Sequence, residues 1–258
     1  MILKYQDIDI NYYDNENNNK DPVIFLHGWG SSLETFKYTF KMLNDTSHVY
    51  AVDFPGFGES KINRAFSLDD YVKFLIYFIT ELNIKNYTIV AHSFGGRVAI
   101  KYLGKHQINN PQGLILVDSA GIKHITPLKV RIKILNYKIK KAYYKTFKKE
   151  AKLSQLYSKS GSEDYQNSSV IMKDTMRNVI KEDLRKYLPN INIDTLIIWG
   201  KEDKTTPYKD AKIMHKYLKK SAIIPFNDSG HFPYLDDAKK FSIIVKGYLK
   251  QITKEGNF

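Results

Sequence analysis

Residues 87–105 read YTIVAHSFGGRVAIKYLGK, a short apolar run followed by a tight turn and then by a segment of helical period. The run from Tyr87 to Ala91 is continuous and apolar, which is typical of a strand buried on both faces of a sheet. The part from Gly95 to Lys105 predicts a helix. The stretch therefore predicts a strand, a turn and a helix in direct succession, with Ser93 in the turn.

The same alternation extends along most of the chain. Further short apolar runs, bounded by Gly, Asp or Pro, predict strands at 23–26, 49–52, 113–117, 195–199 and 222–225. Helical period predicts helices at 67–82, 208–218 and 236–251. Alternating strands and helices argue for right-handed crossovers, so we expect an α/β fold with a mostly parallel sheet flanked by helices. Residues 3–5 and 8–12 predict an antiparallel hairpin at the edge of that sheet.

Composition limits the classes of protein. The chain has 258 residues, of which 43% are apolar and 26% charged, so it can bury one large core and is not intrinsically disordered. No apolar run approaches the roughly 18 residues that a spanning helix needs, and the first residues do not resemble a secretory signal. The chain has no cysteine, which excludes disulfides and thiol catalysis and fits a cytoplasmic location.

The segment 121–186 does not follow this alternation of strands and helices. It holds 17 Lys or Arg against 6 Asp or Glu, whereas the rest of the chain is nearly neutral. Spacing of three and four between apolar residues predicts a helix over 128–146, with lysines off the apolar face, and a second helix over 171–180. We expect an inserted helical cap at 121–186 on a core formed by 1–120 and 187–258. Because 35 of the 40 basic residues are Lys, compositional bias is the favoured explanation of the charge.

Ser93 is the strongest candidate for chemistry. A nucleophile on a tight strand-to-helix turn needs small neighbours two residues away on each side, as in the pattern G-x-S-x-G. Ala91 and Gly95 occupy those positions, and Ala is the smallest departure from the pattern. Serine is a weak nucleophile at its free pKa and needs an adjacent base whose tautomer is fixed by a carboxylate.

Several motifs occur together around this turn: His27-Gly28-Trp29-Gly30, Asp53-Phe54-Pro55-Gly56-Phe57-Gly58, Trp199-Gly200-Lys201-Glu202-Asp203 and Gly230-His231-Phe232-Pro233. With the turn at Ser93, they resemble the α/β-hydrolase fold family, in its serine-nucleophile, cap-bearing branch of esterases and carbon-carbon bond hydrolases. The resemblance covers both halves of the core. It covers the insert only by its position after the sixth strand.

The resemblance implies roles for particular residues. Ser93, Asp203 and His231 stand in the family's order of nucleophile, acid and base, and Asp118 is the alternative acid because some members use that position. The backbone N–H groups of Trp29 and Phe94 would form the oxyanion hole. The resemblance also implies that His27 and His92 are structural. In a lyase branch of the family, an arginine at the position of Arg97 binds a substrate carboxylate.

The favoured function is a serine hydrolase that cleaves a carboxylic ester of a small or medium apolar acyl group through an acyl-enzyme. The apolar face formed by Ile132, Leu135, Ile139 and Tyr143 is expected to roof the acyl pocket above Ser93, since its exposure to water would be costly. Alternatives are carbon-carbon bond hydrolysis, a lyase reaction, an interfacial lipase or lysophospholipase, and a non-catalytic binder. We expect a small-molecule substrate and neither cofactor, metal nor nucleic acid; a membrane surface is the less favoured partner.

Overall fold

The computed structural model describes residues 1–106, 111–124, 128–152, 155 and 169–255. Within these residues the strands form one eight-stranded sheet in the order β1-β2-β4-β3-β5-β6-β7-β8. Their bounds are β1 Ile2–Tyr5, β2 Ile8–Asp14, β3 Pro22–Leu26, β4 His48–Val52, β5 Thr88–His92, β6 Gly113–Val117, β7 Asp194–Gly200 and β8 Ser221–Phe226. The α/β prediction is confirmed, and the predicted strands agree with the observed ones to within one residue at each end, except that β2 extends two residues beyond the predicted 8–12.

Strands β3 to β8 run parallel, whereas β2 pairs antiparallel with both β1 and β4 at the edge of the sheet. The central strands are buried along their whole length, because helices cover both faces of the sheet. In a parallel sheet, all carboxyl ends of the strands meet at one edge. The residues that follow β3, β5, β6, β7 and β8 are therefore brought together at that edge.

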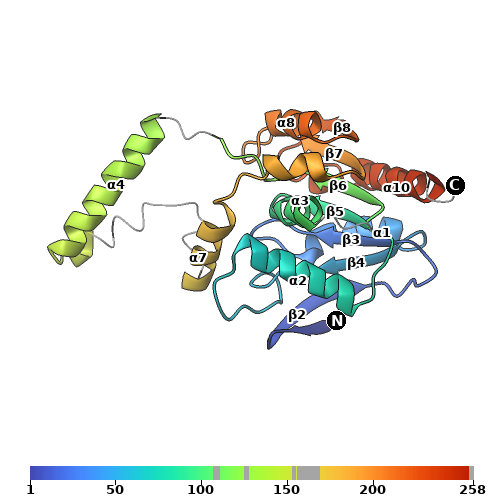
Figure 1. The fold of residues 1–258 in the computed structure, drawn as a ribbon, viewed down its shortest axis with the longest axis horizontal. Helices are drawn as coiled ribbons and strands as arrows, with labels where there is room; N and C mark the ends of the chain where they lie inside the picture. Colours follow the sequence, from blue (N-terminus) through green and yellow to red (C-terminus); the bar gives the residue numbers. More distant parts are fainter. Residues whose placement is uncertain (107–110, 125–127, 153–154, 156–168, 256–258) are drawn as a thin grey trace.

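Helices lie on both faces of the sheet (Figure 1). One face packs against α2 Leu68–Glu81, α3 Phe94–His106 and α8 Lys209–Tyr217, and the other against α1 Lys37–Leu43 and α10 Ala238–Glu255. Helix α2 begins with a capping box, in which Ser67 and Asp70 bond each other's backbone N–H groups. The short helices η1 Leu33–Phe36, η2 Arg185–Asn190 and α9 Pro233–Asp236 were not predicted, since one turn is too short to show a period.

The segment between β6 and β7 contains α4 Leu128–Thr146 and α7 Val170–Val179. Helix α7 is attached to the core: Met172, Thr175 and Val179 are buried, and the Thr175 hydroxyl accepts a hydrogen bond from the N–H of Phe66 at 3.0 Å. Helix α4 extends away from the sheet (Figure 1). Among the described residues, no helix is long and apolar enough to cross a membrane. The polar stretch 158–169 lies outside the described residues except for Ser169.

Candidate active site

Ser93 lies in the turn between β5 and α3 with a φ of 48°. This left-handed conformation is unfavourable for a residue other than glycine, and tight packing holds it. The Ser93 N–H donates to the backbone carbonyl oxygen of Val117 at 3.0 Å, and the Gly95 N–H donates to that of His27 at 3.0 Å. A Cβ on Gly95 would lie 2.4 Å from the Leu26 carbonyl oxygen. The turn therefore requires glycine at position 95, as the pattern around Ser93 predicts.

His231 and Asp203 lie beside Ser93 at the carboxyl edge of the sheet. The Oγ of Ser93 is 3.0 Å from Nε2 of His231, and Nδ1 of His231 is 2.7 Å from a carboxylate oxygen of Asp203. These residues follow β5, β8 and β7, so three distant parts of the sequence form one hydrogen-bonded chain. The geometry is the one that a base-activated serine requires.

The carboxylate of Asp203 is held in its ionised form. Its two oxygens accept bonds from the N–H groups of Thr205 and Thr206, from the Thr206 hydroxyl and from His231, at 2.6 to 2.9 Å. Burial opposes ionisation, but the hydrogen bonds from His231 and Thr206 outweigh it and hold the pKa at about 2. A negative charge at this place fixes the proton of His231 on Nδ1, which leaves Nε2 as an acceptor for the Ser93 proton.

His92 contacts the backbone of His231. Its Nε2 is 2.8 Å from the carbonyl oxygen of His231, and the Tyr234 hydroxyl is 3.2 Å from its Nδ1. Burial and the neighbouring His231 lower the pKa of His92 to about 3, so its ring is neutral. Nε2 therefore carries the proton and donates to His231, while Nδ1 accepts from Tyr234.

His27 is also neutral and structural. Burial lowers its pKa to about 4. Its Nδ1 is 2.7 Å from the carbonyl oxygen of Gly28, and its Nε2 accepts a bond from the N–H of Phe54 at 3.0 Å. The ring thus joins the loop after β3 to the Asp53–Gly58 turn.

The loop after β3 approaches Ser93 closely. A Cβ on Gly28 would lie 2.6 Å from Nδ1 of His92 and 3.3 Å from Cβ of Ser93. The Trp29 ring packs against Phe94 at 5.5 Å and against Phe57 at 4.8 Å. Phe94 is the first residue of α3, where backbone N–H groups have no partner within the helix. The loop that carries Trp29 therefore lies beside the first turn of α3, and the oxyanion hole formed by the N–H groups of Trp29 and Phe94 stays a prediction.

Asp118, the alternative acid, follows β6 and is completely buried. It has a φ of 39°, and its Oδ1 accepts a bond from the N–H of Gly200 at 2.9 Å. Its Oδ2 has no hydrogen-bond partner among the residues that the structure describes. Nδ1 of His231 bonds the carboxylate of Asp203 directly, at 2.7 Å. The geometry favours Asp203 over Asp118 as the partner of the imidazole.

Arg97 does not face the candidate site. Its Nε donates to the carbonyl oxygen of Val179 at 3.1 Å, and its Nη2 donates to the carbonyl oxygen of Glu182 at 2.6 Å. The side chain is buried, so these two bonds occupy its guanidinium group. Arg97 therefore connects α3 to the segment that follows α7, and it is not available to bind a substrate carboxylate.

The expected pocket residues are not where the sequence pattern predicts them. Ile132, Leu135, Ile139 and Tyr143 are 46 to 58% exposed, and α4 lies apart from the sheet (Figure 1). The prediction that this face roofs Ser93 is wrong for this structure. The reason is that α7, rather than α4, covers the core beside Phe66. The apolar face of α4 is narrow and bordered by lysines, and its side chains stay exposed.

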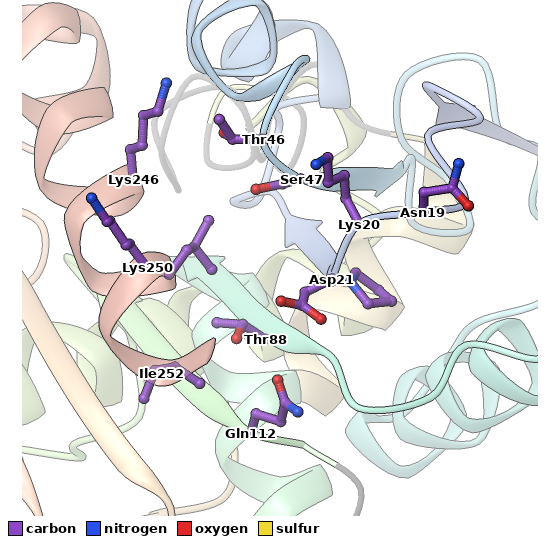
Figure 2. A pocket seen from close by; sticks show the side chains of 12 residues that line it. Asn19, Lys20, Asp21, Thr46, Ser47, Thr88, Gln112, Lys246, Lys250 and Ile252 are labelled. Carbon is purple, nitrogen blue, oxygen red and sulfur yellow. The ribbon is translucent and has the colours of Figure 1, made fainter. Parts of the chain in front are cut away.

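The cavity in Figure 2 lies at the opposite edge of the sheet, where β3 and β5 begin. It measures about 350 Å³ and is lined in part by Lys20, Asp21, Thr88, Gln112 and Lys250. Ser93 follows the carboxyl end of β5, so this cavity is separated from the candidate site by the length of the strand.

Sequence reasoning missed the role of Thr206. Its hydroxyl lies 2.6 Å from Asp203 and 3.0 Å from the carbonyl oxygen of Asp118, so it connects the loops after β6 and β7. The available signal was its spacing of three residues from Asp203, which is typical of an Asp side chain that bonds a nearby backbone N–H group.

Comparisons with known proteins identify the family of this chain. A family model described as the alpha/beta hydrolase family matches residues 23–242. The AB hydrolase superfamily protein YisY of Bacillus subtilis (strain 168) is 27% identical over 252 residues, which cover 87% of this chain and 90% of that protein. A pimeloyl-(acyl-carrier protein) methyl ester esterase of Wigglesworthia glossinidia brevipalpis is 26% identical, with 89% and 93% covered. The solved structure of an esterase (EaEST) from Exiguobacterium antarcticum superposes with a TM-score of 0.72 at 26% identity, covering 94% of this chain and 95% of that one.

Proposed function

The chain belongs to the alpha/beta hydrolase family, and we propose that it is a serine hydrolase that cleaves a carboxylic ester through an acyl-enzyme intermediate. The observation that carries the proposal is the hydrogen-bonded chain from Ser93 through His231 to Asp203. The similarity to a methyl ester esterase and to the esterase EaEST supports ester cleavage as the reaction.

The proposed mechanism uses each residue in one role. His231 takes the proton from Ser93 through Nε2 as Oγ attacks the ester carbonyl, and Asp203 stabilises the imidazolium that forms. The oxyanion accepts hydrogen bonds from the backbone N–H groups of Trp29 and Phe94, which lower the barrier by a few kcal/mol. His231 then protonates the leaving alcohol. In the second half, His231 activates a water molecule that hydrolyses the acyl-enzyme and restores Ser93.

The surroundings of Ser93 favour an uncharged acyl group. Aromatic rings flank the chain of bonds: Trp29 packs on Phe94, and Phe232 lies 5.1 Å from the His231 ring. The guanidinium group of Arg97 is occupied by two backbone carbonyls. These contacts support esters of small or medium apolar acids and argue against the lyase reaction, in which an arginine binds a substrate carboxylate.

A panel of p-nitrophenyl esters tests the proposal. The chain length of the acyl group is varied, a dienone substrate for carbon-carbon hydrolysis is run in parallel, and Ser93→Ala serves as the control. Turnover of esters that disappears in the variant supports the proposal. Turnover of the dienone alone would replace it with carbon-carbon bond hydrolysis.

One observation favours a second candidate function, an interfacial esterase that acts at an anionic lipid surface. Helix α4 has seven Lys or Arg and no acidic residue, and its exposed face carries Ile132, Leu135, Ile139 and Tyr143. A basic amphipathic helix with exposed apolar side chains is typical of a segment that lies in a membrane surface. We keep the cytoplasm as the proposed location, because a chain without cysteine needs no oxidising compartment.

A further inference from the structure

The loops after β6 and β7 bring two carboxyl groups together in the interior. A carboxylate oxygen of Asp118, one of Asp203 and a ring nitrogen of His231 all lie within 4.8 Å of one another. Asp118 is completely buried and Asp203 is 6% exposed. Two ionised carboxylates cannot share such a place, because their repulsion is strong where water is excluded. One of the two must therefore carry a proton.

The hydrogen bonds decide which one carries it. Asp203 accepts bonds from two backbone N–H groups and from His231, so its negative charge is well stabilised. Within the described part of the chain, the carboxyl group of Asp118 accepts a bond only from the N–H of Gly200, and its Oδ2 has no partner. A buried oxygen without a partner is costly as an acceptor. The same oxygen becomes a donor when it carries a proton.

We propose that Asp118 is protonated in the folded protein and donates a hydrogen bond to the carboxylate of Asp203, which it thereby holds in place as a positioning residue. This assignment of a role rests on the proposed function, whereas the state of protonation does not. Asp118 is then neither the alternative acid nor a member of the reacting chain. It acts through Asp203 on the orientation of His231.

The charged and titratable groups around Asp118 support the protonated state. Asp203 and His231 lie beside it, and Asp236 and Tyr234 face it from α9. Two of these groups, Asp203 and Asp236, are carboxylic acids whose negative charges oppose the ionisation of Asp118. Burial, which is the largest cause, and the adjacent Asp203 raise the pKa of Asp118 to about 9, although the bond from Gly200 lowers it.

Infrared spectroscopy tests the protonation directly. The difference spectrum between the wild type and Asp118→Asn at neutral pH should contain the band of a protonated carboxyl group, and the band should vanish as the pH rises through about 9. Asparagine tolerates the positive φ of this position and keeps an N–H donor toward Asp203. Absence of the band in the folded wild type would overturn the proposal.

The pH dependence of stability gives a second measurement without catalysis. Folded Asp118 keeps its proton, whereas the unfolded chain releases it above the ordinary pKa of 3.8. The contribution of this group to stability therefore falls as the pH rises from 3.8 to about 9. Between pH 5 and pH 9, the Tm of the wild type should fall more steeply than that of Asp118→Asn. Equal slopes would contradict the proposal.

Kinetics tests the positioning role. Asp118→Gly accepts the positive φ but removes the donor, so kcat should fall by about 10- to 100-fold with little change in KM, and Asp118→Asn should restore most of it. In the wild type, kcat should fall as the pH rises through about 9, because Asp118 then loses its proton. This fall should be absent from Asp118→Asn. If Asp118→Gly and Asp118→Asn are equally impaired, the positioning role is wrong. If instead Ser93→Ala stays active, the proposed function fails, while the infrared and stability results still stand.

Discussion

The Nε of Arg97 donates a hydrogen bond to the carbonyl oxygen of Val179 at 3.1 Å, and this bond joins the helix after Ser93 to the end of α7. Its Nη2 donates to the carbonyl oxygen of Glu182. Arg97, which lies one helical turn after Ser93, therefore connects α3 to α7 and to the loop that follows α7.

Replacing Arg97 by Met should destabilise the protein by about 1 to 3 kcal/mol, because two carbonyl groups lose their donor. The effect on kcat/KM should be the same for neutral esters and for esters that carry a carboxylate. Urea unfolding and the two kinetic series measure these effects. The control is Arg177→Met, which removes an exposed pairing with Asp174 and should change stability by less than about 1 kcal/mol. A loss specific to carboxylate substrates would return Arg97 to the binding site.

Replacing His92 by Phe should lower kcat by about 10- to 100-fold, because His231 loses the donor that fixes its backbone at 2.8 Å. KM should change little, since His92 contacts His231 rather than the proposed substrate. Tyr234→Phe is the matched control: it removes only the hydroxyl group beside His92 Nδ1 and should have a smaller effect. Equal losses in both variants would point to a general disturbance of packing.

Replacing Asp203 by Asn should lower kcat by about 10⁴-fold, because the amide stabilises the wrong tautomer of His231. The pKa of about 2 means that Asp203 is ionised throughout the range in which such an assay is run. Asp210→Asn provides the comparison, since Asp210 is equally buried but bonds His124 on another loop. If Asp118→Asn were more harmful than Asp203→Asn, the acid would lie after β6.

Replacing Ile132 and Leu135 by Asn distinguishes the two candidate functions. Both side chains are about half exposed, so the Tm should not fall. If α4 binds lipid, sedimentation with anionic vesicles should decrease by at least tenfold, and binding of the wild type should weaken as salt is added. Ile243→Asn on α10, also exposed, is the control. Binding that is absent from the wild type, or insensitive to salt, would exclude the interfacial function.

Sequence reasoning predicted most of the core because its signals are local. Continuous apolar runs identified the strands, and the turn at Ser93 was readable because Gly95 has no room for a side chain. The contacts made by α4 were predicted wrongly. Apolar residues at helical spacing indicate that one face of a helix can be buried. Which part of the protein covers that face depends on long-range packing, and the spacing holds no information about it.

The environment of Asp118 also could not be predicted from the sequence. Its position after β6 made it a candidate acid, but its state depends on Asp203, which is 85 residues away in the chain and meets it only through the order of β6 and β7. Burial and the distribution of donors decided between the two acids, and neither can be read from a motif.

Labelling with a fluorophosphonate tests the central claim most directly, because the probe reacts with an activated serine regardless of the natural substrate. Mass spectrometry of the digested protein should place a single adduct on Ser93. The adduct should be absent from Ser93→Ala, and its rate of formation should fall steeply in His231→Ala. An unlabelled wild type, or an adduct on another residue that persists in Ser93→Ala, would contradict the assignment of Ser93 as the nucleophile.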